Sequence, residues 1–333
     1  MTVENSSALG ALPPEQNPFY KNQQKKLLSR IGLGLLMYTA VTAFLQAALM
    51  VVSEAVFPSF YHSPLFDWIL QIVPSYLVAF PLFCLFLAGM PKKAPEKNRL
   101  GGENSIAFLA ISFLFVLVGN LISTALMSGF EALRGQEISN VVDTYMDSYS
   151  PLFTFVLFVI LAPIVEEIMF RKLVMDRLLP YSERLAVITC ALIFGLIHGN
   201  FYQFFYAALL GALFSIVYVK TGKLRYTIMM HMIINFTGST IASFLAEATS
   251  DQVTLASSIN PWVMVAGIYS MATYLLAGCG LIFLILKWKK LNLSKVGDRY
   301  LTLGTQFKLA WGNVGMILFA VFSGITFIFS IFI

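Results

Sequence analysis

Charged side chains are scarce in this sequence. Only 12% of its 333 residues are Asp, Glu, Lys or Arg, whereas 58% are hydrophobic. Soluble domains carry about 25% charged residues, so the composition excludes an ordinary soluble globular protein. It is typical of a helical integral membrane protein, because a helix satisfies its own backbone hydrogen bonds in lipid. We therefore expect an all-α, polytopic bundle of transmembrane helices.

Cysteine and histidine are also rare, with three of each. An odd number of cysteines, all inside apolar stretches, predicts neither a disulfide framework nor a cysteine-based metal site. Any chemistry that uses imidazole must draw on the three histidines alone. The cysteines are Cys84, Cys190 and Cys279, and the histidines are His62, His198 and His231.

Apolar stretches of about 20 residues are long enough to cross a bilayer as helices. The stretch at 185–199 is the shortest candidate and could be tilted or could end inside the protein, so we expect eight or nine spans. The candidates are 31–56, 65–89, 105–128, 151–176, 185–199, 202–219, 224–246, 262–286 and 309–333.

The basic residues indicate which segments face the cytoplasm. With nine spans and a cytoplasmic N-terminus, Arg134 is the one Lys or Arg that falls on the opposite side of the membrane. This distribution fits the rule that positive charge stays on the cytoplasmic side. We therefore expect a multi-pass protein of the cell membrane whose partner is the lipid bilayer. The net charge of +5 is explained by topology and does not predict nucleic-acid binding.

The spans and loops predict five regions. Residues 1–30 form a polar, flexible cytoplasmic tail, and residues 31–128 form three N-terminal spans. Residues 129–150 form an extracytoplasmic loop, and residues 151–247 form a central helical core. Residues 262–333 form two C-terminal spans joined by a basic cytoplasmic loop.

Two adjacent carboxylates, Glu166 and Glu167, follow a long apolar stretch. A charge inside a bilayer costs at least about 2.5–3.5 kcal/mol on insertion scales, so such residues are functional candidates. Glu167 lies four residues before Arg171, on the same helix face and in the favourable order for an ion pair. Glu166 points about 100° away around the helix. The spacing predicts a Glu167–Arg171 pair and leaves Glu166 available for proton chemistry.

Two histidines also lie in candidate spans. Phe194 precedes His198 by four residues, and His231 precedes Asn235 by four, so each pair shares a helix face. Taken singly, these residues and the Glu–Arg pair have structural explanations, such as capping, packing or contacts between helices. A straight helix from Arg184 would carry His198 about 20 Å inward. We therefore expect a tilted or broken fifth helix, or a cavity that reaches the middle of the membrane.

Taken together, the three motifs resemble a known family. Glu-Glu-x-x-x-Arg, Phe-x-x-x-His and His-x-x-x-Asn follow one another within residues 166–235. This order resembles the CPBP (Abi) intramembrane proteases, which comprise the type II CAAX prenyl endopeptidases and bacterial relatives linked to bacteriocin processing and self-immunity. The resemblance covers roughly residues 151–245, so the central core would be the catalytic one.

The resemblance implies a glutamate-dependent endopeptidase that hydrolyses a membrane-associated peptide or protein at the cytoplasmic side. Glu166, with His198, would hold and deprotonate the attacking water. His231 and Asn235 would stabilise the oxyanion of the tetrahedral intermediate. The supporting residues would be Glu167, Arg171 and Phe194.

Metal dependence and two rival functions stay open at this point. Glu166, His198 and His231 could form a metalloprotease-like zinc triad, but the chain has no His-Glu-x-x-His helix, and we expect no cofactor. Buried Glu, His and Asn also build the proton relays of coupled transporters, although no inverted repeat is visible. The other alternative is a non-catalytic scaffold or bacteriocin self-immunity protein.

Overall fold

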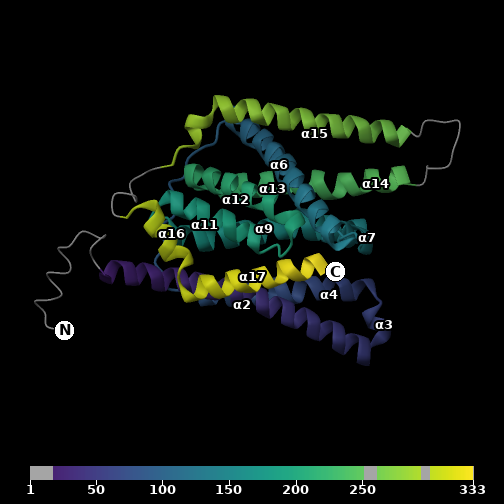
Figure 1. Cartoon of the computed structure of the whole chain (residues 1–333), viewed down its shortest axis with the longest axis horizontal. Helices are drawn as coiled ribbons and strands as arrows, with labels where there is room; N and C mark the ends of the chain where they lie inside the picture. The colour runs from purple at the N-terminus through teal and green to yellow at the C-terminus, as the bar shows by residue number, and fades with distance from the viewer. Residues whose placement is uncertain (1–17, 251–260, 294–300, 333) are drawn as a thin grey trace, which may run out of the picture. The chain divides into compact units, whose positions relative to one another are not determined.

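The computed structural model describes residues 18–250, 261–293 and 301–332. Within these ranges the chain is helical and contains no strand (Figure 1). Eight of the described helical stretches are long and apolar enough to cross a membrane. The prediction of an all-α, multi-pass membrane protein is therefore confirmed.

The helices follow one another closely along the chain. The N-terminal elements are α2 (Pro18–Val56), α3 (Pro58–Tyr61), α4 (Pro64–Ile72), η1 (Val73–Ala79), α5 (Phe80–Phe86), α6 (Gly102–Arg134) and α7 (Val141–Ser148). The central elements are α8 (Pro151–Thr154), η2 (Phe155–Leu161), α9 (Ala162–Glu167), η3 (Ile168–Met175), α10 (Asp176–Leu178), α11 (Glu183–Leu196), α12 (Phe201–Thr221), α13 (Leu224–Asn235), η4 (Phe236–Ile241) and α14 (Ala242–Ser250). The last are α15 (Pro261–Leu286), η5 (Trp288–Leu291), α16 (Leu303–Trp311) and α17 (Val314–Phe332).

One sequence expectation differs from the structure, and the short fifth helix agrees with the expectation that this stretch could end inside the protein. Helix α2 begins at Pro18, so residues 18–30, expected in a flexible tail, are helical; residues 1–17 lie outside the described ranges. Proline suits a first helical turn, and the Lys- and Gln-rich segment after it favours helix. Helix α11, within the expected fifth span, has only 14 residues. That is about 21 Å of helix, too short to cross a hydrocarbon core of about 30 Å alone.

The chain divides into two compact units that do not follow chain order. Every candidate site residue lies in the second unit. The first unit comprises Met1–Lys93, Leu173–Thr189 and Ser294–Thr326, and the second comprises Ala94–Lys172, Cys190–Leu293 and Phe327–Ile333.

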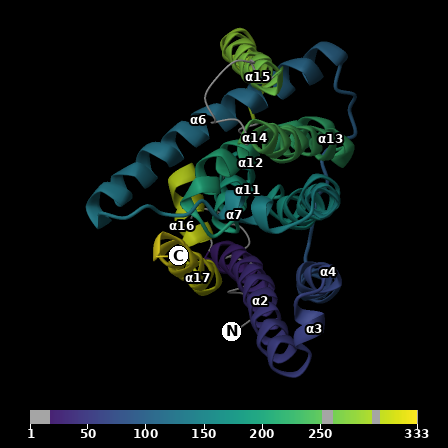
Figure 2. The same cartoon turned by 90° about the vertical axis from the view of Figure 1, so that its right-hand side faces the viewer.

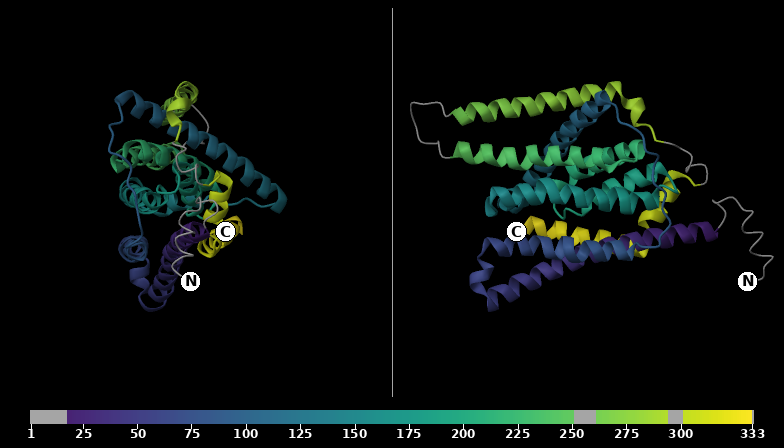
Figure 3. Two further views of the ribbon diagram at one scale, coloured as in Figure 1. Left: turned by 90° about the vertical axis from the view of Figure 1, so that its left-hand side faces the viewer. Right: turned by 180° about the vertical axis from the view of Figure 1, so that it is seen from behind.

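In the first unit, α2 folds back through α3 onto α4 to form a helical hairpin (Figure 3). The Arg30 side chain closes the far end of this hairpin. Its Nε donates to the carbonyl of Phe86 at 2.8 Å, and its Nη2 donates to the carbonyl of Ala88 at 3.1 Å. Arginine thus satisfies carbonyls that the end of α5 leaves without intrahelical donors.

In the second unit, α6 crosses diagonally over α12 and packs against α15 (Figure 2). Both crossings depend on glycine. A Cβ at Gly119 would collide with the backbone of Tyr206 on α12, and one at Gly280 would collide with the carbonyl of Ala110. Small residues allow helices to approach closely in membranes, where packing drives association. Helix α12 also contacts α13, and α13 contacts α9, the segment that carries the adjacent carboxylates.

Candidate active site

The adjacent carboxylates lie at the end of α9, a short stretch between the π-helical segments η2 and η3. In η2 the backbone bonds reach back five residues, as when the Ala162 N–H donates to the Leu157 carbonyl. Continuing that pattern would require an N–H on Pro163 directed at the Phe158 carbonyl, and proline has none. The helix therefore changes its hydrogen-bonding pattern just before Glu166. Single π turns of this kind frequently accompany functional sites.

Glu167 is held entirely inside the protein. Its Oε2 lies 3.2 Å from Nε of Arg171, and neither side chain is exposed. The Arg171 Nη2 donates to the Gly211 carbonyl at 3.2 Å, and the guanidinium lies 4.9 Å from the centre of the Phe194 ring. A buried charge is stable only when partners surround it. The Glu167–Arg171 pair predicted from the spacing is confirmed.

His231 lies between the two acids. Its Nδ1 is 3.2 Å from Glu167 Oε1, and its Nε2 is 3.9 Å from Glu166 Oε2. In the neutral imidazole, Nδ1–H therefore donates to Glu167 and Nε2 carries a lone pair. The distance from this lone pair to the Glu166 carboxylate is too long for a direct hydrogen bond and leaves room for a bridging water.

Glu166 differs from Glu167 in exposure. Its side chain is 27% exposed, whereas that of Glu167 is not exposed at all. The Oε2 atoms of both acids are buried and make no hydrogen bond in the described part of the chain, but Glu167 Oε2 lies 3.2 Å from the Arg171 guanidinium. Of the two adjacent acids, Glu166 is therefore the one that can accept a proton from a reactant.

His198 follows the end of α11. Its Nδ1 lies 2.6 Å from the Phe194 carbonyl, and because a carbonyl can only accept, Nδ1–H is the donor. Gly199 turns the chain with a φ of +68°, and Asn200 then caps α12 by accepting from the Gln203 N–H. The structural expectation of a cap is thus met, and Nε2 of His198 still carries a lone pair. The ring interacts electrostatically with both Glu166 and His231.

The Phe194 ring packs against residues from all three sequence motifs. It is buried, and its centre lies 5.2 Å from that of His198, 5.7 Å from that of His231 and 5.0 Å from that of Phe170. Edge-to-face contacts of this kind hold aromatic rings in defined orientations. Phe214 also packs against His231, with 5.7 Å between the two ring centres. Sequence reasoning missed Phe214, since a phenylalanine in an apolar span gives no signal beyond ordinary packing.

Asn235 has a different partner from the other candidates. Its Nδ2 donates at 2.8 Å to the carbonyl of Phe158, 77 residues earlier in the chain. The structure therefore brings Glu166, His198 and His231 into one electrostatic cluster and ties Asn235 to the backbone of the same broken helix. In the sequence, Pro163 is the one indication that the Phe158 carbonyl, five residues earlier, needs a donor from outside its own helix.

A row of polar side chains on α12 also reaches the site. Asn200 Nδ2 donates to Gln203 Oε1 at 2.8 Å, and Gln203 Nε2 donates to the Tyr206 hydroxyl at 3.1 Å. Tyr206 interacts electrostatically with Glu166. The three residues recur every third position in an apolar helix, a pattern that sequence reasoning could have found but did not.

Glu166, His198 and His231 are side chains of the types that bind zinc. Both histidines donate Nδ1–H to a carbonyl or carboxylate, as metal-binding histidines commonly do. However, no group of three or more His, Cys, Asp or Glu side chains in the described ranges has the geometry to hold a metal ion. The residues as placed do not fit a zinc triad.

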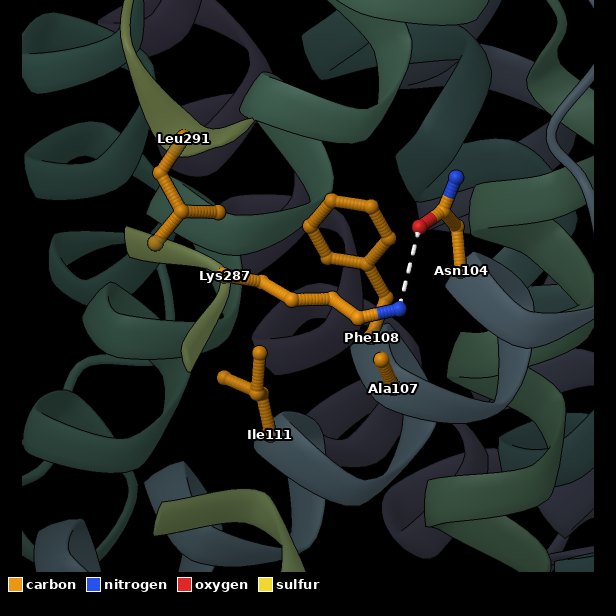
Figure 4. A pocket seen from close by; sticks show the side chains of 6 residues that line it. All are labelled: Asn104, Ala107, Phe108, Ile111, Lys287 and Leu291. Atoms are coloured by element: carbon orange, nitrogen blue, oxygen red, sulfur yellow. Dashed lines mark hydrogen bonds between the residues drawn. The ribbon is translucent and has the colours of Figure 1, made fainter. Parts of the chain in front are cut away.

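A small cavity of about 10 Å³ lies elsewhere in the second unit, between α6 and the end of α15 (Figure 4). Its walls are mainly apolar, and Lys287 Nζ donates across it to Asn104 Oδ1 at 3.3 Å. That volume admits about one water at most, so the cavity has no room for a substrate.

One comparison with known proteins gives a match. The family model for type II CAAX prenyl endopeptidase Rce1-like proteins matches residues 148–237. The matched range contains all four residues expected to be catalytic, and the resemblance to the CPBP family is confirmed there. The match implies a protease, and the eight apolar helices place it in a membrane. No curated protein and no solved structure matches the chain.

Proposed function

We propose that the chain is a glutamate-dependent intramembrane endopeptidase that hydrolyses a peptide bond at the cytoplasmic side of the cell membrane. One observation carries the proposal. Glu166 is partly exposed and faces Nε2 of His231, while its neighbour Glu167 is unexposed and lies 3.2 Å from both Arg171 and His231. A partly exposed acid beside a structural one matches the requirement for a single general base.

In the proposed reaction, Glu166 and the Nε2 atom of His198 hold one water molecule. Glu166 accepts a proton from that water while the water oxygen bonds to the carbonyl carbon of the peptide. The carbonyl oxygen then carries the negative charge of a tetrahedral intermediate. Glu166 returns the proton to the peptide nitrogen, the C–N bond breaks, and a carboxylic acid and an amine leave.

His231 is suited to the oxyanion in one protonation state. The Nδ1–H group of His231 remains hydrogen-bonded to Glu167. A proton bound at Nε2 therefore turns Nε2 from an acceptor into a donor. The second N–H of Asn235 adds a neutral donor, because only one of its two amide hydrogens is needed for the Phe158 carbonyl. Loss of one oxyanion donor typically costs about 10²–10³ in rate.

The proposed topology follows from charge. The proposal counts α11 together with the turn after it as a ninth crossing, and a cytoplasmic N-terminus then keeps every Lys and Arg except Arg134 on the cytoplasmic side. In that orientation Arg171 and Lys172 mark the cytoplasmic end of their span, and Glu166 lies about 8 Å inward from Arg171 at 1.5 Å per residue. A peptide that enters from the cytoplasm or the inner leaflet would reach this depth.

The test compares membrane-peptide profiles from cells that express the wild type and Glu166→Gln. Peptides that accumulate only with the wild type identify cleavage sites, which purified protein in liposomes should then reproduce. Glu54→Gln is the matched control, because Glu54 is an exposed acid on α2 in the other unit. Full cleavage by Glu166→Gln would exclude the proposal. Proton uptake into liposomes that depends on Glu166, without cleavage, would favour a transporter.

A further inference from the structure

The hydrogen bond between Asn235 and the Phe158 carbonyl links two helices at a broken point in the backbone. It is 2.8 Å long and joins α13 to η2. Phe158 lies eight residues before Glu166 on the same continuous span. The bond therefore acts on the helix that carries the proposed general base.

Pro163 explains why a side-chain donor is useful there. The i→i−5 pattern of η2 ends with Ala162, and Pro163 has no N–H with which to continue it to Phe158. In lipid, a backbone carbonyl deprived of its helical donor needs one from a neighbouring helix. The Asn235 amide supplies that donor in place of the proline nitrogen.

Helix α13 therefore forms hydrogen bonds to the broken span on both sides of Pro163. On the N-terminal side Asn235 bonds the Phe158 carbonyl, and on the C-terminal side His231 bonds Glu167 at 3.2 Å. His231 and Asn235 are one turn apart on α13. Two fixed points on either side of a helix irregularity determine both its rotation and its axial position.

We infer that Asn235 is a positioning residue: by donating to the Phe158 carbonyl in place of Pro163, it sets the rotation of α9 that directs Glu166 towards His231. This deepens the proposed function and rests on it for the activity measurements. The role adds to any hydrogen bond from Asn235 to the oxyanion, and the two roles predict different coupling to Pro163.

The test is a double-mutant cycle between Asn235→Ala and Pro163→Ala. Alanine at position 163 restores a backbone N–H, so the Phe158 carbonyl no longer depends on Asn235. Misplacement by about 1 Å can cost about 10²-fold in rate, so the positioning role should add a roughly 10- to 100-fold loss of kcat to the cost of losing an oxyanion donor in Asn235→Ala, with KM nearly unchanged. In the Pro163→Ala background the loss of kcat should be smaller by that same factor, because only the oxyanion role of Asn235 is then removed.

An equal loss of kcat in both backgrounds would overturn the inference and leave Asn235 as an oxyanion donor only. Ser239→Ala is the matched control, because Ser239 is one turn beyond Asn235 and donates to its carbonyl, not to Phe158. It should leave kcat within about 2-fold of the wild type.

The same four proteins are also compared by thermal unfolding in detergent, which needs no substrate. Asn235→Ala should lower Tm in the wild-type background and have little effect beside Pro163→Ala. Equal lowering in both backgrounds would contradict the link between Asn235 and Pro163, even if Pro163→Ala is inactive. If no substrate is cleaved by the wild type, the proposed function fails, but this unfolding cycle still decides whether Asn235 replaces the proline donor.

Discussion

Glu167 meets a different cationic or donor group with each of its oxygens: Oε2 lies 3.2 Å from Arg171 and Oε1 lies 3.2 Å from Nδ1 of His231. One partner is a single turn away on the same span, and the other is 64 residues away on α13. Glu167 therefore fixes the orientation of His231, and His231 presents its other nitrogen to Glu166. Glu167 thus has a structural role, and Glu166 is left for the proposed chemistry.

These different roles predict opposite outcomes for Glu166→Gln and Glu167→Gln. Glu166→Gln should lower the cleavage rate by about 10²–10⁴-fold, because the amide cannot accept the proton from water. Its Tm should stay close to that of the wild type, since the side chain is partly exposed. Glu167→Gln should lower Tm markedly, because Arg171 loses its buried counter-charge. Cleavage assays and thermal unfolding on the same preparations check both, and equal losses of stability would contradict the assignment.

The buried ion pair predicts non-additive effects on unfolding. Arg171→Met leaves a buried carboxylate without its ion pair, which typically costs about 3–5 kcal/mol. Adding Glu167→Gln should recover part of that loss, because no uncompensated charge remains. Unfolding in detergent and denaturant measures the difference. Lys287→Met is the control, since its partner Glu103 is 78% exposed and such pairs contribute about 0–1 kcal/mol. Additive losses for Glu167 and Arg171 would show that the pair is not coupled.

Helix α6 offers a matched pair of glycines. Gly119→Ala should be destabilising by about 1–3 kcal/mol, because the new Cβ would collide with the backbone of Tyr206 and push α12 away. Gly129→Ala meets nothing within 4 Å and should be neutral or slightly stabilising, since Ala favours helix over Gly by up to about 1 kcal/mol. Thermal unfolding of the two variants separates these outcomes. Equal Tm values would contradict the close packing of α6 on α12.

The donor geometry predicts that cleavage does not require a metal. Cleavage should persist in the presence of EDTA and 1,10-phenanthroline, because water activation is assigned to the side chains of Glu166 and His198. The rate is measured on purified protein before and after prolonged dialysis against chelator. One tightly held zinc per chain by atomic absorption, together with loss of cleavage on its removal and recovery on its return, would overturn this prediction.

Several features of the fold could be predicted from the sequence because they depend on local chemistry. Hydropathy identified the eight long helices, since the length and polarity of a segment decide whether it can lie in lipid. Helical periodicity identified the Glu167–Arg171 pair, because residues four apart face the same way in any helix. The order of the three motifs indicated the same segment, residues 148–237, that the family model matches.

Other features required the tertiary structure. Periodicity places His231 and Asn235 on one face of α13, but it does not say which residues that face meets. Those partners, Glu167 and the Phe158 carbonyl, are 64 and 77 residues away. They are reached only because glycine contacts and buried aromatic rings fix how the helices pack.

The position of His198 shows the same distinction. The sequence left a tilted helix, a broken helix and a deep cavity open, and in the structure α11 ends at Leu196 and Gly199 turns the chain. The sequence by itself determined which groups are available and which way each faces on its own helix, because backbone geometry is local. Only the tertiary structure decided which of them meet, because contacts between helices depend on the packing of the whole second unit.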